Sequence, residues 1–455
     1  MLEKVSNIFK VEELKKKIFI TLSLLIVYRA GCFIPTPGVD TFALSQFFDK
    51  LTETQGQTIF GMINLFTGGA LTRMSIFALG IMPYISGSII MQLLTAVVPA
   101  LERIAQEGKA GYEKINQYTR YLTLVICVIQ GLFLSLWLGN SRNFIIGGEE
   151  FVIVPDPNLL FRLITILTLT AGTIFIMWLG EQIQERGIGN GISLIITASI
   201  ISRIPSSLAQ LWVLWSPLDA TNRQIPTPTV LLLLGLWFLV VMAVVLFTQA
   251  QRRIPIQYGK RVVGRRVYGG QSTYLPIRID MAGVIAIIFA SVVLSVPSTL
   301  GMFISTQAKP FSFLQSIIQQ RGLWYNFIYV GFIVFFMYFY TAIVFRPLEI
   351  SNNLKKYGGF IPGIRPGKST AEYLDYVATR IVFIGAFYVS VIATLPNMIM
   401  HLFRVPSYAL ASLFGGTTLL IMVGVILDTM KQIEGQLLIR HYEGFMKKGT
   451  LRGRR

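Results

Sequence analysis

The sequence predicts an all-α polytopic membrane protein with ten transmembrane helices. Of its 455 residues, 53% are hydrophobic and only 14% are charged, whereas soluble domains average about 25% charged residues. Ten separate apolar runs approach the roughly 20 residues that a helix needs to cross a bilayer. The basic residues lie mainly in alternate connecting segments, as the positive-inside rule requires.

The ten runs follow one another along most of the chain. The fifth is the least regular, because Arg203 and Pro205 interrupt its end. The runs cover residues 18–34, 76–98, 119–138, 160–180, 190–207, 229–249, 281–300, 324–345, 380–400 and 408–427.

The distribution of Lys and Arg orients these spans. An even number of spans places both termini on one side, and that side holds 30 of the 40 basic residues, against nine on the other. Both termini are therefore expected in the cytoplasm. Residues 1–17 contain five Lys and three Glu between apolar side chains. This pattern fits either a short amphipathic helix on the membrane surface or an ordinary basic flank.

The chain lacks the side chains that most transport and enzyme chemistry requires. The two cysteines, Cys32 and Cys127, lie inside apolar runs and form no CxxC pair. The middle of every run is free of Asp, Glu, Lys and His, although such groups mark most ion and proton pathways. Arg29 is the exception, and it is expected to snorkel or to pair with carbonyl groups. The inventory predicts no catalytic residue, no metal site and no cofactor.

Two glycine-containing segments need an explanation. Residues 187–191 look like a nucleotide-binding loop, but no strand precedes them, so a helix-breaking turn is preferred. Residues 58–75 are apolar, too short to span, and contain Gly68 and Gly69 just before the second run. They fit a half-helix folded back into a cavity, or an interfacial helix on the outer face.

Two connecting segments are also unusual. Residues 252–266 hold six basic residues and no acid, with Ile254, Ile256 and Tyr258 in alternation. The alternation predicts a projecting hairpin, which either binds phosphate groups or an acidic protein surface or merely fixes the topology. Residues 355–368 are so rich in Gly and Pro that we expect an ordered set of turns, with Arg365 directed at a partner.

A last pattern concerns isoleucines. Ile81 and Ile85 are four residues apart, as are Ile192 and Ile196, so each pair shares a helix face. Such residues ordinarily face lipid, and the spacing alone does not indicate a pore.

Taken together, these stretches resemble the SecY family of protein-conducting channels over essentially the whole chain. The motifs that carry the resemblance lie at residues 33–39, 75–86, 185–193, 251–255, 270–273 and 338–345, together with the Arg365 loop. The resemblance implies two inverted five-helix halves, residues 1–207 and 229–455, joined by an external hinge at 208–228. It also implies cytoplasmic loops at 250–280 and 346–379 and a basic C-terminal tail at 428–455.

The resemblance further implies which residues serve the channel. Residues 58–75 match the plug helix, with Phe60, Asn64, Phe66, Gly68, Gly69 and Arg73. The pore ring corresponds to Ile81, Ile85, Ile192, Ile196, Ile288 and Ile421. The lateral gate corresponds to Ser86, Gly87, Ser291, Val292 and Val296. The docking sites for a ribosome or motor correspond to Arg252, Arg253, Lys260, Arg261, Arg265, Arg266 and Arg365.

The function implied is the conduction of unfolded polypeptides across a bacterial cytoplasmic membrane, with lateral release of apolar segments into the bilayer. The expected partners are SecE and SecG subunits, the SecA motor ATPase, ribosomal RNA, signal peptides, nascent chains and membrane lipids. The chain departs from the family at Ala286, where Pro is usual, and at Val292 and Val296, which replace residues that are often Ser and Phe. An inverted-repeat secondary transporter is the alternative, but it would need a polar midplane site.

Overall fold

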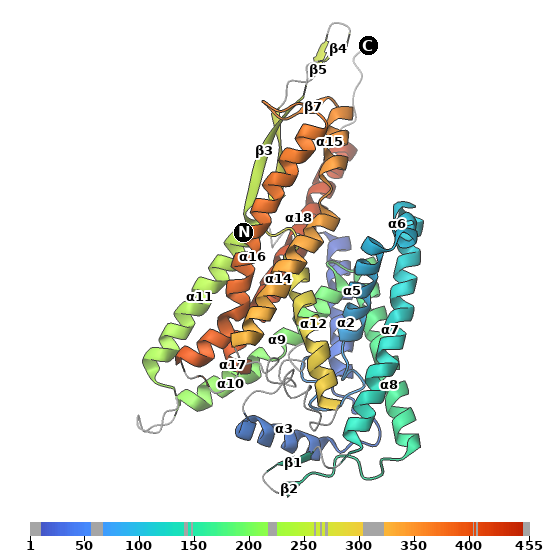
Figure 1. Ribbon diagram of the computed structural model, residues 1–455, viewed down its shortest axis with the longest axis vertical. Coiled ribbons are helices and arrows are strands. Elements are labelled where there is room, and N and C mark those ends of the chain that lie inside the picture. Colours follow the sequence, from blue (N-terminus) through green and yellow to red (C-terminus); the bar gives the residue numbers. More distant parts are fainter. Residues whose placement is uncertain are drawn as a thin grey trace.

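Long helices dominate the computed structural model and run roughly along its longest axis (Figure 1). The description covers residues 11–55, 67–140, 144–146, 149–216, 225–258, 261–263, 266–268, 272–303, 323–403, 405 and 408–448.

The helices of the first half of the chain are α2 (Glu12–Gly31), α3 (Thr41–Gln55), α5 (Met82–Val97), α6 (Pro99–Gln106), α7 (Lys109–Leu138), α8 (Leu159–Arg186), α9 (Gly191–Ile201) and α10 (Ile204–Trp215). Those of the second half are α11 (Thr227–Gln249), α12 (Gly283–Phe303), α14 (Leu323–Val344), α15 (Pro347–Lys356), α16 (Lys368–Phe403), α17 (Tyr408–Leu413) and α18 (Thr417–Lys448). Each predicted run overlaps at least one of these helices, so the all-α polytopic prediction is confirmed.

Seven helical segments of the described chain are long and apolar enough to cross a membrane. They are Lys109–Leu138, Leu159–Arg186, Gly191–Trp215, Thr227–Gln249, Trp324–Lys356, Lys368–Phe403 and Leu410–Leu438. The pair α5 and α6, bent by 99° at a short break, makes an eighth if it is one span. The first and seventh predicted runs coincide with α2 and α12, which are not among these segments, so the count of ten remains a prediction.

The helix of the second predicted run, α5, begins later than the hydropathy of the sequence indicates. Residues 76–81 form turns, and α5 starts only at Met82. Gly80 has a φ of +58° and Met74 one of +43°, so the backbone leaves the right-handed helical region twice before α5. The turns are held by the segment that follows α2, because the amide N–H of Ile76 donates to the carbonyl oxygen of Ile34 at 2.9 Å.

Three described helices, α3, α6 and α15, lie outside the predicted runs, and α3 is the longest of them. α3 lies at the end of the molecule opposite the hairpin (Figure 1). Leu44, Phe47 and Phe48 on one face of α3 are buried in a cluster with Trp137 and Phe144. Their spacing of three and four residues is the pattern of an amphipathic helix, so the signal was present in the sequence.

The projecting hairpin is confirmed. β3 (Gln251–Tyr258) pairs antiparallel with β6 (Ser272–Arg278), and β4 (Arg261–Val263) pairs with β5 (Arg266–Tyr268) farther out (Figure 1). Ile254 and Ile256 are buried while their neighbours along β3 are exposed. β7 (Gly359–Phe360) adds to the outer edge of β3 with Gln257 opposite Phe360. The two unusual loops are therefore one structural unit. A separate small hairpin pairs β1 (Ile145–Ile146) with β2 (Glu149–Glu150).

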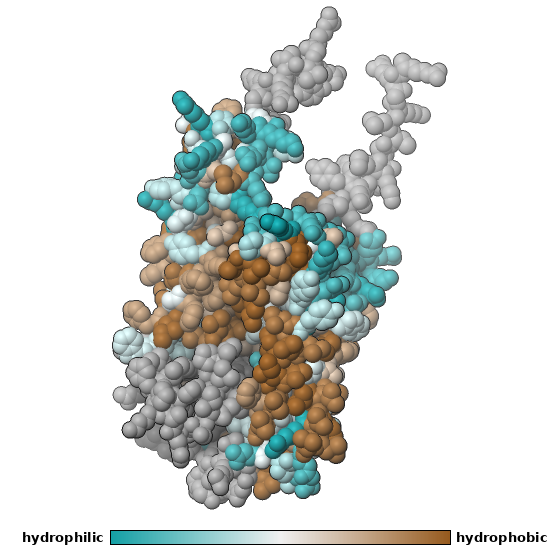
Figure 2. All heavy atoms as spheres, turned by 45° about the vertical axis from the view of Figure 1, so that its right-hand side comes forward, coloured by the Kyte–Doolittle hydropathy of each residue, from teal (hydrophilic) through white to brown (hydrophobic). Residues whose placement is uncertain are grey.

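Hydrophobic side chains form a band on the surface below a hydrophilic end (Figure 2). Exposed residues such as Phe238, Phe383 and Phe387 contribute to the outer surface of the long helices, which suits contact with lipid tails. Inside, helices approach closely at glycines. A Cβ atom on Gly191 would lie 1.8 Å from the carbonyl oxygen of Gly180, so α8 and α9 touch backbone to backbone there.

Candidate pore and gate

The six isoleucines of the predicted ring belong to one buried cluster. Ile81 and Ile85 come from the start of α5, Ile196 from α9, Ile288 from α12 and Ile421 from α18, and all are almost completely buried. Ile192, on α9, is half-buried and packs against the same cluster. The cluster contains many other residues besides these six. The structure therefore places the six isoleucines in one core, and their role as a ring stays a prediction.

The elements that meet in this cluster come from both ends of the chain. α5 packs against α12, and α9 packs against α18. The cluster therefore lies at the contact between residues 1–207 and residues 229–455, the two predicted halves. The two helix pairs each carry isoleucines of the set, so the seam between the halves is closed here by branched apolar side chains.

A polar cavity lies on one side of the isoleucines. It has a volume of about 500 Å³ and is lined by charged and polar side chains, among them Asn190, Asp280, Asp428 and Lys431. Its apolar lining includes Val425, which is four residues after Ile421 on α18 and so one helical turn away. A water-accessible space thus ends about one turn from the isoleucine cluster. Sequence reasoning missed this cavity because its residues come from separate elements.

The described end of the predicted plug segment, residues 67–75, lies on the other side. Gly68 packs against Ser199, near the end of α9, and the guanidinium group of Arg29 donates to the Gly68 carbonyl oxygen at 2.8 Å. Asn190, Ile196 and Ser199 thus mark three successive levels of α9. At about 1.5 Å per residue they span roughly 14 Å. Along this helix the order is polar cavity, isoleucines, plug segment.

Charge and aromatic contacts hold this end of the plug segment. Arg29 and Arg73 both place their guanidinium groups near the ring of Phe33, at 4.9 and 4.3 Å from its centroid. Of the two expectations for Arg29, pairing with a carbonyl group is the one that the structure bears out. Gly69 is also described, with a φ of +89°. The predicted plug residues Phe60, Asn64 and Phe66 lie outside the described residues.

The predicted lateral-gate residues lie on α5 and α12, which pack against each other. Ser86 is half-buried, and Ser291 and Val292 are buried. The hydroxyl groups of the two serines donate to carbonyl oxygens of their own helices, those of Met82 and Ile288. Gly87 instead faces α7, since its nearest neighbours are atoms of Thr123 and Thr119. Val296 is on α12, but its side chain lies outside the described residues. α12 is one unbroken helix through Ala286.

The predicted docking residues are gathered at the hairpin end. Arg252 and Arg253 are exposed on β3, and Arg365 is exposed in the turns after β7. Those turns are ordered, as expected, because the hydroxyl of Ser351 donates to the Gly367 carbonyl oxygen at 2.6 Å. Arg261 lies on β4 and Arg266 on β5, but their side chains are outside the description. Lys260 and Arg265 lie outside the described residues altogether.

The glycine-containing loop at 187–191 forms the predicted turn. Gly189 has a φ of +94°, and the Asn190 side chain caps α9 by accepting from the Ser193 amide. The Ile188 amide donates to the hydroxyl of Thr21, and the Gly189 amide donates to the side chain of Gln432 on α18. Two backbone donors of the loop are thus committed to side chains from both ends of the chain.

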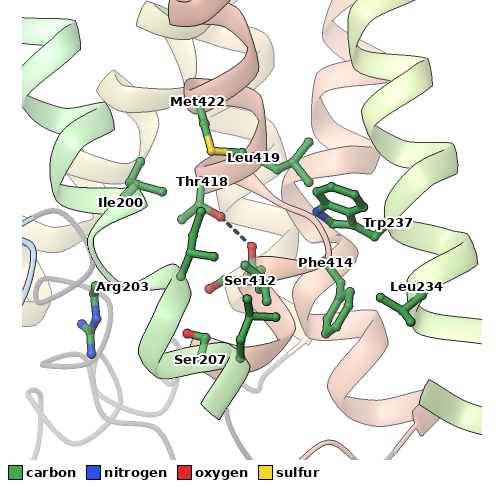
Figure 3. Close-up of a pocket in the computed structure, with 13 residues that line it drawn as sticks. Ile200, Arg203, Ser207, Leu234, Trp237, Ser412, Phe414, Thr418, Leu419 and Met422 are labelled. Carbon is green, nitrogen blue, oxygen red and sulfur yellow. Dashed lines mark hydrogen bonds between the residues drawn. The ribbon is translucent and has the colours of Figure 1, made fainter. Parts of the chain in front are cut away.

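The start of the predicted hinge is helical. Residues 208–215 are the end of α10, where Leu211 clusters with Leu410 and Phe414 of the second half. A cavity of about 280 Å³ lies between α9, α10, α11, α17 and α18, with Arg203 at its edge (Figure 3). The Thr418 hydroxyl donates to the Ser412 carbonyl oxygen at 2.6 Å beside it.

Comparison with known proteins identifies close relatives over the full length. The family model described as SecY matches residues 75–430. The protein translocase subunit SecY of Aquifex aeolicus is 44% identical over 450 residues, which is 98% of this chain and 100% of that protein. The SecY subunit of Thermotoga maritima is 43% identical over 451 residues, 99% of each chain.

Solved structures share the fold. One described as the structure of a protein conducting channel has a TM-score of 0.62 at 18% identity, covering 93% of this chain and 92% of that one. Another, of Sec61 in a canine ribosome–channel complex from the endoplasmic reticulum, has a TM-score of 0.58 at 17% identity and covers 93% and 92%.

Proposed function

The chain belongs to the SecY family and forms the protein-conducting channel of the Sec translocase, and we propose that unfolded polypeptides cross it between its two helical halves. The observation that carries this proposal is the buried cluster in which isoleucines of α5, α9, α12 and α18 meet about one turn from a polar cavity. A channel for polypeptides needs a water-filled entrance and a seal. The polar cavity can serve as the entrance, and the isoleucine cluster beside it can serve as the seal.

The seal acts through its chemistry. Six branched apolar side chains offer water and ions no hydrogen bond, so a narrow collar of them dewets when it is empty. The same side chains hold no cargo by charge or hydrogen bonds, so a passing chain of any sequence meets a similar surface. The Arg29 contact with Gly68 keeps one end of the plug segment beside the collar.

A side exit between α5 and α12 accounts for membrane insertion. A segment inside the pore that reaches this seam partitions between the aqueous path and lipid. Leu or Ile favours lipid by about 0.3–0.6 kcal/mol per residue, whereas Asp, Lys or Arg disfavours it by about 2.5–3.5 kcal/mol. The sorting therefore needs no catalytic group. Ser86, Ser291 and Val292 are the described residues proposed to line the exit.

The proposed assembly follows from the charged end of the molecule. We assign the hairpin end to the cytoplasm of a bacterial cell, with both termini there, on the bias of Lys and Arg. Arg252, Arg253 and Arg365 are exposed on one structural unit, which supports its use by ribosomal RNA or by the SecA motor. SecE and SecG subunits, signal peptides and lipids complete the proposed partners.

The seal is tested by placing a polar side chain in the collar. We expect Ile421→Asn to raise the ion conductance of the idle channel in reconstituted vesicles several-fold, because the amide group stabilises water there. Ile421→Val, which keeps the surface apolar, should leave the conductance low. Unchanged conductance in both Ile421→Asn and Ile81→Asn would contradict the collar.

A further inference from the structure

Two arginines approach each other beside the described end of the predicted plug segment. Arg29 lies in the last turn of α2, and Arg203 lies in the short break between α9 and α10. A Cβ atom on Gly68 would lie 3.1 Å from the Cα atom of Ser199 and 3.3 Å from Nη1 of Arg29. Ser199 is four residues before Arg203 and so about one helical turn away. The two guanidinium groups are close enough to interact electrostatically.

One of these groups carries a buried donor. Nη1 of Arg203 is inaccessible to solvent and has no hydrogen-bond partner among the described residues. Arg203 stands at the edge of the cavity of about 280 Å³, and its guanidinium group is directed away from the other labelled side chains (Figure 3). The cavity is lined mainly by apolar side chains, such as those of Ile204 and Leu208. Because a buried charged donor is costly to leave unpaired, this nitrogen favours a ligand that accepts hydrogen bonds.

Acidic side chains do not balance the positive charge at this place. Within the part of the chain that the structure describes, neither Arg29 nor Arg203 forms an ion pair. The Gly68 carbonyl group that accepts from Arg29 is neutral. Arg73 brings a third cation, because its guanidinium group and that of Arg29 both lie near the ring of Phe33. Since partly buried charges are screened only weakly by salt, these cations repel one another.

The backbone adds to the same potential. α10 begins directly after Arg203, with Pro205 in its first turn, and it is 12 residues long. The N-terminus of a helix carries a partial positive charge and backbone N–H groups that suit an anion. Two guanidinium groups and one helix N-terminus therefore converge where α2 meets the break between α9 and α10.

We propose that a small monovalent anion of the chloride class binds between the guanidinium groups of Arg29 and Arg203. The proposal goes beyond the proposed function and does not depend on the path of the polypeptide. Guanidinium is a weakly hydrated cation, and the apolar cavity beside it favours a weakly hydrated anion. A phosphate or sulfate group carries more oxygens than the donors described here can satisfy. The bound anion reduces the repulsion between the arginines and so stabilises the contact of Arg29 with Gly68.

Thermal unfolding of the purified channel with its bound subunits tests the proposal. The channel is placed in discs of neutral lipid, and chloride replaces gluconate at constant ionic strength. We expect the Tm to rise along a saturable curve, by roughly 3–5 °C when chloride is in hundredfold excess over its Kd. Crystals grown in bromide should show an anomalous peak within hydrogen-bonding reach of both guanidinium groups.

The variant Arg203→Gln separates a bound anion from a structural role of the arginine. It should abolish the chloride dependence and, in gluconate, melt at or above the Tm of the unaltered channel, because the repulsion with Arg29 is gone. Loss of a purely structural contact would instead lower the Tm equally in both salts. Arg203→Lys keeps the charge and should keep a weaker rise. Arg73→Gln is the matched control, because it removes one nearby exposed cation and should leave the rise in place.

Three results would overturn the proposal. The first is a Tm that is the same in chloride and gluconate at every concentration. The second is an equal rise with chloride in Arg203→Gln, or, if that variant does not fold, a bromide peak that is absent from the two arginines. The third is a Tm that follows the anionic lipid content of the discs and not chloride, which would assign the site to a lipid phosphate group.

Discussion

At the scale of single residues, glycines set how closely the helices around the seal approach. Gly191 begins α9 against Gly180 of α8, and a Cβ atom at Gly191 would meet a backbone carbonyl oxygen at 1.8 Å. Backbone yields less readily than the end of a side chain, so a methyl group there must move one of the helices. Ile192 follows directly, so the displacement reaches the collar.

We therefore expect Gly191→Ala to destabilise the protein by about 1–3 kcal/mol, as overpacked sites commonly do. A lower Tm in detergent and a higher idle conductance in vesicles would both report the shift of Ile192. Gly235→Ala on α11 is the matched control, because nothing lies within 4 Å of a Cβ atom there. Equal Tm values for the two variants would show that the contact between α8 and α9 adapts without cost.

The sequence predicted the structural roles of some of these residues and not those of others. The turn at 187–191 follows from local chemistry and is as predicted, and the structure adds that Asn190 caps α9. Two expectations were left open for Arg29, because its partner Gly68 is 39 residues away in the sequence. The groove that Glu102, Glu349, Glu372 and Asp375 line gave no signal in the sequence, since α6, α15 and α16 bring these residues together only in three dimensions.

At the scale of elements, long apolar runs predicted helices well, but the sequence did not predict short elements or contacts between distant residues. The start of α5 was set by turns at Met74 and Gly80, which hydropathy does not register. α3 is too short and too polar to read as a span, although its buried face was periodic. The alternation in β3 predicted the hairpin, but the pairing of β3 with β7 joins Gln257 to Phe360, which are distant in the sequence, and has no local pattern.

The hairpin carries a prediction about ribosome binding. Arg265→Glu with Arg266→Glu should weaken the affinity of the channel for ribosomes, with the largest loss at low salt, where exposed charges are least screened. The slope of log affinity against log salt should fall by roughly two if both residues contact phosphate. Binding of ribosomes to channel vesicles over a salt series measures both quantities.

The control for that measurement is Arg103→Glu with Lys109→Glu, which alters exposed basic residues away from the hairpin. It should leave the slope unchanged. An affinity equal to that of the unaltered channel at every salt concentration would remove the phosphate contacts from the account and leave the hairpin as a topology signal.

At the scale of the whole molecule, we propose that the channel runs along the seam between two sets of helices. The isoleucine cluster closes the seam, the polar cavity opens on one side of it, and the described end of the predicted plug segment lies on the other. Composition and the charge bias predicted a multi-pass membrane protein. The meeting of α5, α9, α12 and α18 required the family resemblance, because no local pattern relates residues 81 and 421.

The most direct test of this account is where an arrested polypeptide touches the channel. Single cysteines would replace Ile81, Ile196 or Ile421, and the lipid-exposed Phe238 or Phe387 as controls. The native Cys32 and Cys127 are buried and interfere little. A secreted chain stalled midway, with one cysteine in its mature part, should form disulfides at the three isoleucine positions and not at the two phenylalanines. Crosslinks at the phenylalanines alone, or at none of the five positions while the chain is protected from added protease, would contradict a pore between the halves.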